Sequence, residues 1–356
     1  MSRISVVGRA GAAAGVVAGM TALGVAAQRH AARRIMGRVD PEAGEQFGSL
    51  SGTAHTVLAD DGTELHVEVD EPTLSAATSK SPPLTLVFCH GFALSEHEWH
   101  YQRRDLRDLG RLVFWDQRGH GRSGRGPDDS YTVEQVGADL RRVLDVIAPD
   151  GPLVLVGHSM GGMSILRLAT TDPALFGDRV LGVVLVATSA DERGRSLPVP
   201  LPSLVRRLAP GVATQLSRHP ELVGRALELS DDLVLVLTQR YGFGSTSASP
   251  SMVDLVRDMH MSTPLDVLGD FMPSFETYDA TGGLAALHRV ETVVIAGTED
   301  AIISSDRSAD IVRQVPGAEL VLLDGAGHML PLERYPEVNQ AVREIVARVQ
   351  RHRVAL

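Results

Sequence analysis

Residues 153–169 read LVLVGHSMGGMSILRLA, and this stretch decides the fold. It opens with an apolar run at 153–156, which predicts a buried strand. After several small residues, apolar side chains return at helical spacing, at Met163, Leu166 and Ala169. The sequence therefore predicts a strand, a sharp turn and a helix.

Ser159 stands at the apex of this turn, within the pattern GHSMGG. Such an apex occupies a sparsely populated backbone conformation, and Gly157, Gly161 and Gly162 allow the helix to pass close to the strand. The serine hydroxyl would lie at the positive end of the helix, where developing negative charge is favoured. This G-x-S-x-G turn is typical of a nucleophilic serine, which needs a histidine as base and an acid to orient it.

Later parts of the chain supply both groups in the order serine, acid, histidine. A predicted strand at 292–296 is followed by Glu299 and Asp300, and spacing alone does not separate these two acids. A predicted strand at 318–323 is followed by a glycine-flanked turn that carries His328. Because His328 comes third in this order, it is the best base candidate among the 13 histidines.

A further apolar run at 84–89 predicts a buried parallel strand that ends in His90-Gly91-Phe92. Attack on a carbonyl creates an oxyanion, which two fixed backbone N–H groups must stabilise. We expect these donors from Met160, which follows the serine, and from Phe92. His90 is expected to shape its loop by hydrogen bonding rather than to act as a base.

The remaining patterns outline the rest of an α/β core. A hairpin (54–58 and 64–69) and strands at 111–115 and 180–186 are predicted, with helices at 98–109, 133–147 and 336–349. The charges on the first helix, Asp105 included, are expected at the surface. The segment 116–123, DQRGHGRS, is interpreted as a structural loop held by internal hydrogen bonds.

Between residues 191 and 288 the β-branched runs typical of strands are replaced by segments with helical patterns, at 204–208, 220–229, 231–240 and 252–261. We interpret this region as a helical cap that covers the serine. Its large apolar residues either line an apolar cavity or pack the cap helices together: Met252, Met259, Met261, Phe271, Met272, Phe275 and Tyr278.

Composition narrows the function. A chain of 356 residues suits one catalytic core with an inserted cap. The net charge of −10 argues against nucleic acid as a partner. The single cysteine, Cys89, excludes an internal disulfide and a cysteine-rich metal site, and no zinc-binding spacing occurs. No metal or cofactor is therefore expected, and the oligomeric state is not predicted.

Residues 10–27 carry no charge and are flanked by arginines on both sides. Their length suits an uncleaved membrane anchor, and the arginines that follow would keep the catalytic domain on the cytoplasmic side. The alternatives are an export signal, which those same arginines disfavour, or a soluble leader. In each case this segment lies outside the fold.

Taken together, these motifs resemble the capped α/β-hydrolase superfamily over about residues 53–349. The matching segments are His90-Gly91-Phe92, 116–123, GHSMGG at 157–162, Gly297 to Asp300, and Gly327-His328. The resemblance implies a mostly parallel, doubly wound sheet with an inserted helical cap. It divides the chain into a leader with a linker (1–51), a first core part (52–190), the cap (191–288) and a second core part (289–356).

The same resemblance assigns the acid to Asp300 rather than Glu299, and implies ester cleavage through an acyl-enzyme formed on Ser159. Epoxide hydrolases and haloalkane dehalogenases share the architecture but carry aspartate at the apex, so Ser159 argues against both. The alternatives are thioester, lactone or carbon–carbon bond hydrolysis, amide cleavage, perhydrolysis, or a ligand-binding module without turnover. The apolar cap favours a hydrophobic ester, and a real anchor would favour a lipid-derived one.

Overall fold

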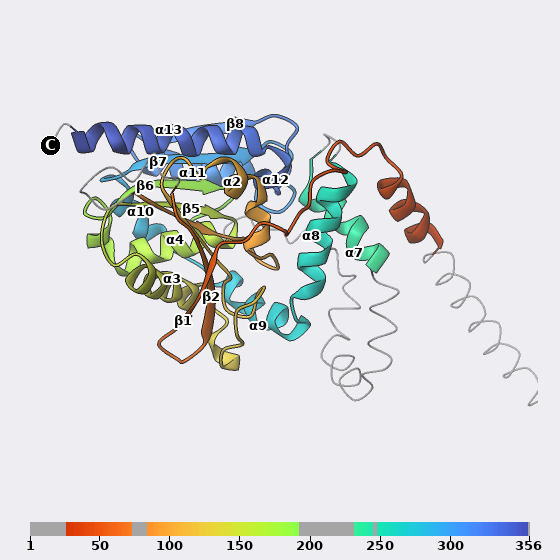
Figure 1. The fold of residues 1–356 in the computed structure, drawn as a ribbon, viewed down its shortest axis with the longest axis horizontal. Coiled ribbons are helices and arrows are strands. Elements are labelled where there is room, and N and C mark those ends of the chain that lie inside the picture. The colour runs from red at the N-terminus through yellow and green to blue at the C-terminus, as the bar shows by residue number, and fades with distance from the viewer. Residues whose placement is uncertain (1–25, 73–83, 192–230, 245–247, 355–356) are drawn as a thin grey trace, which may run out of the picture.

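The computed structural model describes residues 26–72, 84–191, 231–244 and 248–354. Eight strands form one sheet in the order β1-β2-β4-β3-β5-β6-β7-β8 (Figure 1). The strands β1 and β2 pair in antiparallel fashion, β2 also runs antiparallel to β4, and all other neighbours are parallel. The bounds are β1 (Thr53–Leu58), β2 (Glu64–Asp70), β3 (Thr85–Cys89), β4 (Arg111–Trp115), β5 (Leu153–His158), β6 (Val180–Val186), β7 (Glu291–Gly297) and β8 (Glu319–Leu323).

The sheet is mostly parallel, as predicted, and the predicted strands agree with the observed ones to within two residues at either end. The reason is visible in β5. Leu153 and Leu155 pack into one core cluster, whereas Val154 and Val156 pack into a second cluster on the other face. A strand buried on both faces has no polar side, so it appears in the sequence as a continuous apolar run.

Helices cover both faces of the sheet (Figure 1). The helices α3 (Val133–Ile147) and α4 (Met160–Thr171) pack against each other on one face, where α10 (Leu284–Leu287) and α11 (Ser305–Gln314) also lie. The helices α2 (His100–Asp105) and α13 (Tyr335–Val354) lie on the other face, with the short α12 (Leu330–Glu333) beside them. This is the doubly wound arrangement that the sequence predicts.

The chain reverses its direction of travel across the sheet at β3. From β3 it crosses to β4 on one side and then returns to β5 on the other side. In open α/β sheets, ligands bind beyond the carboxyl ends of the strands at such a switch point. The loop after β3 and the turn that carries Ser159 after β5 are the two loops that meet there.

The predicted helix at 98–109 is shorter and less exposed than expected. It begins as the 3-10 helix η1 (Glu96–Trp99) and continues as α2, which ends at Asp105. The expectation that its charges lie at the surface is wrong for Glu98, which is fully buried, and for Arg103, which is 3% exposed. Arg103 is held inside by ion pairs with Glu68 and Asp70.

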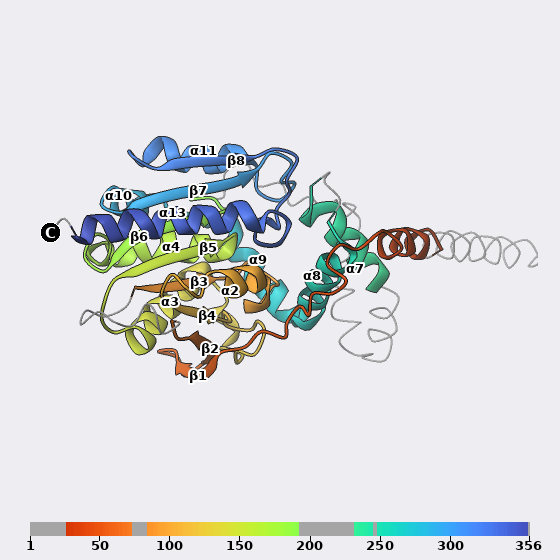
Figure 2. The same cartoon turned by 45° about the horizontal axis from the view of Figure 1, so that its top comes forward.

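Several helices are inserted between β6 and β7. The described ones are α7 (Asp231–Leu237), the π-helical turn η4 (Thr238–Gly242), α8 (Pro250–Ser262) and α9 (Leu265–Glu276), and α7 and α8 lie beyond one end of the sheet (Figures 1 and 2). The predicted helices at 204–208 and 220–229 lie outside the described residues.

Most of the large apolar residues of these helices pack rather than line a cavity. Phe271 and Tyr278 are fully buried in the core cluster shared with α3 and α4. Met252 and Met259 pack in a separate cluster with residues of α7 and of the helix at 26–36. Met261 is 39% exposed, so it does not pack in either cluster.

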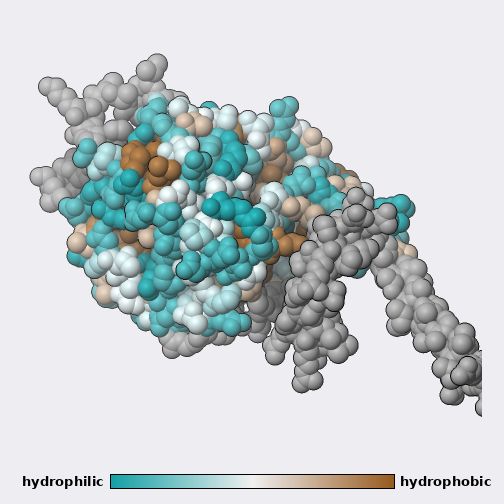
Figure 3. Space-filling view, turned by 90° about the horizontal axis from the view of Figure 1, so that it is seen from below, coloured by the Kyte–Doolittle hydropathy of each residue, from teal (hydrophilic) through white to brown (hydrophobic). Residues whose placement is uncertain are grey.

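The helix at 26–36 contacts this separate cluster through Ala32 and Ile35. The predicted anchor at 10–27 lies outside the described residues except for residues 26 and 27. Among the helices that the structure does describe, none is both long and apolar enough to span a bilayer. On the face seen in Figure 3, the described residues are largely hydrophilic and apolar residues form small separate groups, which is ordinary for a protein surface.

Candidate active site

The turn between β5 and α4 places Ser159 at the N-terminus of α4 in a strained conformation. Its φ is 49° and its ψ is −116°, a backbone conformation that residues other than glycine rarely adopt. The glycines around it are required by space: a Cβ at Gly161 would lie 2.0 Å from the carbonyl oxygen of Cys89, and one at Gly157 would lie 2.6 Å from the carbonyl oxygen of Gly161. Ser159 is buried, with 7% of its surface exposed.

His328 and Asp300 lie side by side after β8 and β7. The Nδ1 atom of His328 is 2.7 Å from Oδ2 of Asp300. The other carboxylate oxygen, Oδ1, accepts hydrogen bonds from the backbone N–H groups of Ile302 and Ile303, both at 2.8 Å. These bonds fix the orientation of the carboxylate independently of the histidine ring. The structure therefore brings Asp300, rather than Glu299, to His328. The carboxylate accepts a hydrogen bond from the Nδ1–H group of His328, so Nε2 is the unprotonated ring nitrogen and can accept a proton.

The loop of His328 reaches the serine turn through the residue that precedes Ser159. Nε2 of His158 lies 3.0 Å from the carbonyl oxygen of His328, and the two rings are 4.8 Å apart. The N–H of His328 donates to the carbonyl oxygen of Gly242 at 2.8 Å. The base candidate is thus held on one side by the turn and on the other by the segment between α7 and α8.

Phe92 and Met160 follow the neighbouring strands β3 and β5. Among the described residues, neither the N–H of Phe92 nor that of Met160 has a hydrogen-bond acceptor. The next amide of the loop, at Ala93, is already used, because it donates to Nε2 of His120 at 3.1 Å. Two unused N–H groups beside a serine are what an oxyanion site requires.

The histidines of the loops are structural acceptors. Nε2 of His90 accepts the N–H of Gln117 at 2.8 Å, and Nε2 of His120 accepts the N–H of Ala93. Burial lowers the pKa of His90 to about 4 and that of His120 to about 3, so both rings are neutral at pH 7. His90 therefore shapes its loop, as expected from the sequence.

The loop at 116–123 is also held by internal hydrogen bonds. Oδ1 of Asp116 accepts the N–H of Glu96, and Oδ2 accepts the N–H of Arg122, both at 2.8 Å. Arg118 is fully buried and holds Asp139 through two hydrogen bonds of 2.7 Å. These contacts fix the loop against η1 and α3, and the N–H of His66 in β2 donates to Oγ of Ser123, which agrees with the structural interpretation.

Glu98 is a site residue that the sequence interpretation missed. Its carboxylate accepts the N–H of Gly91 at 3.2 Å and lies 3.1 Å from Nδ1 of His158, in the fully buried space between the two loops. The available signal was an acid closely following the His90-Gly91-Phe92 loop. An amphipathic pattern cannot distinguish that acid from a surface one.

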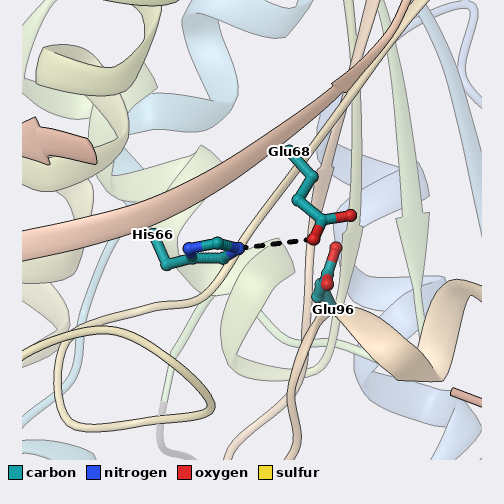
Figure 4. A group of neighbouring side chains, drawn as sticks. All are labelled: His66, Glu68 and Glu96. Carbon is teal, nitrogen blue, oxygen red and sulfur yellow. Dashed lines mark ion pairs between the residues drawn. The ribbon is translucent and has the colours of Figure 1, made fainter. Parts of the chain in front are cut away.

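One group of side chains has the composition of a metal site. The ligand atoms of His66, Glu68 and Glu96 all lie within 4.8 Å of one another (Figure 4). However, Arg103 lies 2.6 Å from Glu68 and 3.1 Å from Glu96, and Arg122 contacts both carboxylates as well. Two guanidinium groups already neutralise these acids, so the group is an ion-pair network in which a further cation would be repelled.

A groove of about 710 Å³ lies between the helix at 26–36 and the segment that includes α7 and η4. Ile35, Val236 and Phe243 line it, together with Arg34, Arg38 and Arg240. Glu299, which precedes the candidate acid Asp300, also lines the groove. Ser159 is not among the lining residues. Elsewhere, the ring of Phe92 packs against Phe271 and Phe275, with ring centroids 5.8 and 5.0 Å away.

Comparison with known proteins identifies the family of the chain. A family model described as "Alpha/beta hydrolase family" matches residues 86–341. Among curated proteins, the chain is 26% identical over 309 residues to epoxide hydrolase A of Mycobacterium tuberculosis, covering 73% of this chain and 89% of that protein. It is 29% identical over 152 residues to the monoacylglycerol lipase of Mycolicibacterium smegmatis, covering 40% and 54% of the two chains.

Among solved structures, a thermophilic esterase from Thermogutta terrifontis is similar, with a TM-score of 0.63 and 23% identity. The match covers 84% of this chain and 99% of that one. At this level of identity the likeness demonstrates the shared fold alone, and the names of the relatives span more than one reaction.

Proposed function

The chain belongs to the alpha/beta hydrolase family, and on that basis we propose that it is a serine hydrolase cleaving carboxylic esters of apolar small molecules or lipids. The observation that carries the proposal is the hydrogen bond between Asp300 and His328 on a loop tied to His158, the neighbour of Ser159. A nucleophile, an oriented base and two unused amides then share one end of the sheet.

In the proposed reaction, His328 takes the proton of Ser159 as the serine oxygen attacks the ester carbonyl. The N–H groups of Phe92 and Met160 stabilise the oxyanion, and Asp300 stabilises the imidazolium that forms. The alcohol leaves with the proton from His328, which gives an acyl-enzyme. Water then attacks that ester with His328 as base, releasing the acid and restoring the serine.

The apex residue favours this reaction over the opening of an epoxide. A carboxylate that opens an epoxide forms an ester, which water can cleave in a second step. A serine oxygen that did the same would form an ether, which the residues described here have no means to hydrolyse. The likeness to an epoxide hydrolase therefore supports the fold, and Ser159 supports acyl transfer.

The apolar composition of the inserted helices supports an apolar substrate. Membrane association through residues 10–27 stays a prediction from the sequence, and it would bring the enzyme to lipid-derived esters.

The test is hydrolysis of a series of p-nitrophenyl esters of increasing acyl length by the wild type and by Ser159→Ala. We expect Ser159→Ala to lower kcat by at least about 10³-fold. Ser164→Ala is the matched control, since it removes a buried hydroxyl of the same helix that donates to the carbonyl oxygen of Gly161.

Labelling of Ser159 by a fluorophosphonate gives a second readout that does not depend on the choice of ester. Full turnover by Ser159→Ala would contradict the proposal. Labelling without turnover of any ester would instead favour thioester, lactone or carbon–carbon bond hydrolysis. Folded protein that is neither labelled nor active would favour a ligand-binding module.

A further inference from the structure

A buried series of hydrogen bonds connects the oxyanion loop to the loop of the base. The N–H of Gly91 donates to Oε1 of Glu98 at 3.2 Å, and Oε2 of Glu98 lies 3.1 Å from Nδ1 of His158. Nε2 of His158 lies 3.0 Å from the carbonyl oxygen of His328. Glu98 and His158 are fully buried, so neither can touch a substrate.

The acceptors fix where the protons lie. The carbonyl oxygen of His328 can only accept, so Nε2 of His158 must carry a proton. One further proton then joins Nδ1 of His158 to the carboxyl group of Glu98, whichever atom holds it, and the pair is neutral overall. Burial raises the pKa of Glu98; burial would lower the pKa of His158, but the Glu98 carboxylate raises it above its ordinary value. Both directions favour retention of that shared proton.

The pair contacts three segments that the proposed reaction needs. Glu98 accepts a hydrogen bond from the N–H of Gly91, and this bond orients the peptide next to Phe92. His158 packs closely against the same loop, because a Cβ on Gly91 would lie only 2.9 Å from Nδ1 of His158. His158 itself directly precedes Ser159. Through Nε2 it holds the carbonyl group of His328, whose ring meets Asp300.

We propose that Glu98 and His158 are positioning residues, which keep the oxyanion loop, the serine turn and the loop of His328 in register. The inference rests on the proposed function, since it assigns these residues a part in that reaction. Because the two side chains act through their neighbours, their loss should lower kcat and leave KM unchanged. A displacement of about 1 Å of a catalytic group costs on the order of 100-fold in rate.

Two substitutions of His158 separate its two hydrogen bonds. In His158→Gln, the longer side chain can place an amide N–H near the position of Nε2 and keep the bond to His328. In His158→Asn, the shorter side chain can replace only Nδ1, so it keeps the contact with Glu98 and loses the bond to His328. We expect kcat to fall on the order of 100-fold in His158→Asn and by clearly less in His158→Gln, with KM constant in both.

The matched control is His288→Asn. Nε2 of His288 also faces a backbone carbonyl oxygen, that of Gln314 at 3.0 Å, but at an exposed position outside the site. We expect kcat of this variant to stay within about twofold of the wild type. Equal kcat in His158→Asn and His158→Gln would contradict the proposal.

A second readout does not depend on turnover. Ring ¹⁵N and ¹H shifts of His328, measured by NMR at fixed pH on histidine-labelled full-length protein, should change in His158→Asn and stay closer to wild type in His158→Gln and His288→Asn. Unchanged His328 shifts in His158→Asn would overturn the proposal. If they change while the wild type shows no Ser159-dependent turnover, ester cleavage fails and the positioning of His328 stands.

Glu98→Gln keeps the proposal testable if His158→Asn does not fold. The amide that replaces the carboxylate can accept from Gly91 and donate to Nδ1 of His158, so His158 should be neutral with its proton on Nε2. The NMR spectrum of this variant should therefore retain the Nε2–H signal of His158. A proton on Nδ1 instead would show that the bond to the carbonyl oxygen of His328 is absent, and would overturn the proposal.

Discussion

Oδ2 of Asp300 lies 2.7 Å from Nδ1 of His328, while Oδ1 of the same carboxylate accepts two backbone N–H groups. In Asp300→Asn, the amide oxygen can keep the backbone bonds, and the amide nitrogen then faces His328. Two donors cannot share a hydrogen bond, so His328 would move its proton to Nε2 and lose the lone pair that the base needs. We expect kcat/KM for a p-nitrophenyl ester to fall by about 10⁴-fold.

Glu299→Gln is the matched control for this prediction, because it neutralises the adjacent acid. We expect kcat/KM to stay within about twofold of the wild type. Thermal unfolding of both variants checks that the fold is intact. A larger loss in Glu299→Gln than in Asp300→Asn would exchange the roles of the two acids.

Ser159 stores strain that glycine would relieve. A residue in such a conformation costs about 1–3 kcal/mol, whereas glycine adopts it freely. Glycine also lowers the free energy of unfolding by about 0.4–1 kcal/mol, because it increases the conformational entropy of the unfolded chain. We therefore expect Ser159→Gly to be more stable than Ser159→Ala by about 1 kcal/mol, and we expect both variants to be inactive. Urea denaturation of the two variants measures the difference, and equal stability would show that the turn is not strained.

The fold could be predicted from the sequence because its strongest signals are local. The apolar runs of β3 and β5 and the helical spacing of α3 are set by burial of each element, and no partner has to be known. The candidate site was predictable for the same reason, because Ser159 and His328 stand on glycine-flanked turns after apolar strands.

The interior charges could not be predicted in this way. Glu98 and His158 are separated by 60 positions in the chain, and no periodicity links them. Arg103 lies on a helix whose pattern resembles a surface helix, yet it meets acids from β2. Whether a charged side chain is solvated or buried depends on partners that only the tertiary fold brings together.

Because the serine turn is closely packed, we expect Gly161→Ala to lower the stability of the protein strongly. The added Cβ would lie 2.0 Å from the carbonyl oxygen of Cys89 and 2.7 Å from that of His90, so backbone has to move. We expect a loss of about 3 kcal/mol in the free energy of unfolding, at the upper end for overpacking. Urea denaturation measures it, and activity should fall as well, because the oxyanion loop is displaced.

Gly269→Ala is the matched control for this substitution. Gly269 lies in α9, and an added Cβ would meet no atom of the described structure within 4 Å. Alanine is the better helix former, so this variant should gain about 1 kcal/mol of stability and keep its activity. A loss of stability in Gly269→Ala similar to that in Gly161→Ala would mean that close packing is not the cause.

The neutral histidines behind the oxyanion loop predict sensitivity to acid. The pKa of His120 falls from 6.5 to about 3 on burial, and that of His90 falls to about 4. Between about pH 4 and pH 6.5 the unfolded state therefore binds more protons than the native state, so stability falls as the pH falls. Each such histidine contributes about 1.4 kcal/mol per pH unit to that slope.

His120→Gln tests this sign, because its amide oxygen can still accept the N–H of Ala93 but cannot be protonated at these pH values. The free energy of unfolding, measured by urea denaturation from about pH 6.5 to pH 4, should fall less steeply than in the wild type by about 1.4 kcal/mol per pH unit. Groups such as Glu96, whose pKa is raised to about 7 by burial and by Asp116, titrate in both proteins and cancel in the difference. His55→Gln, at an exposed position of β1, is the control, and its free energy of unfolding should depend on pH as in the wild type. If the curve of His120→Gln also had the slope of the wild type, His120 would not be a neutral histidine in the folded state.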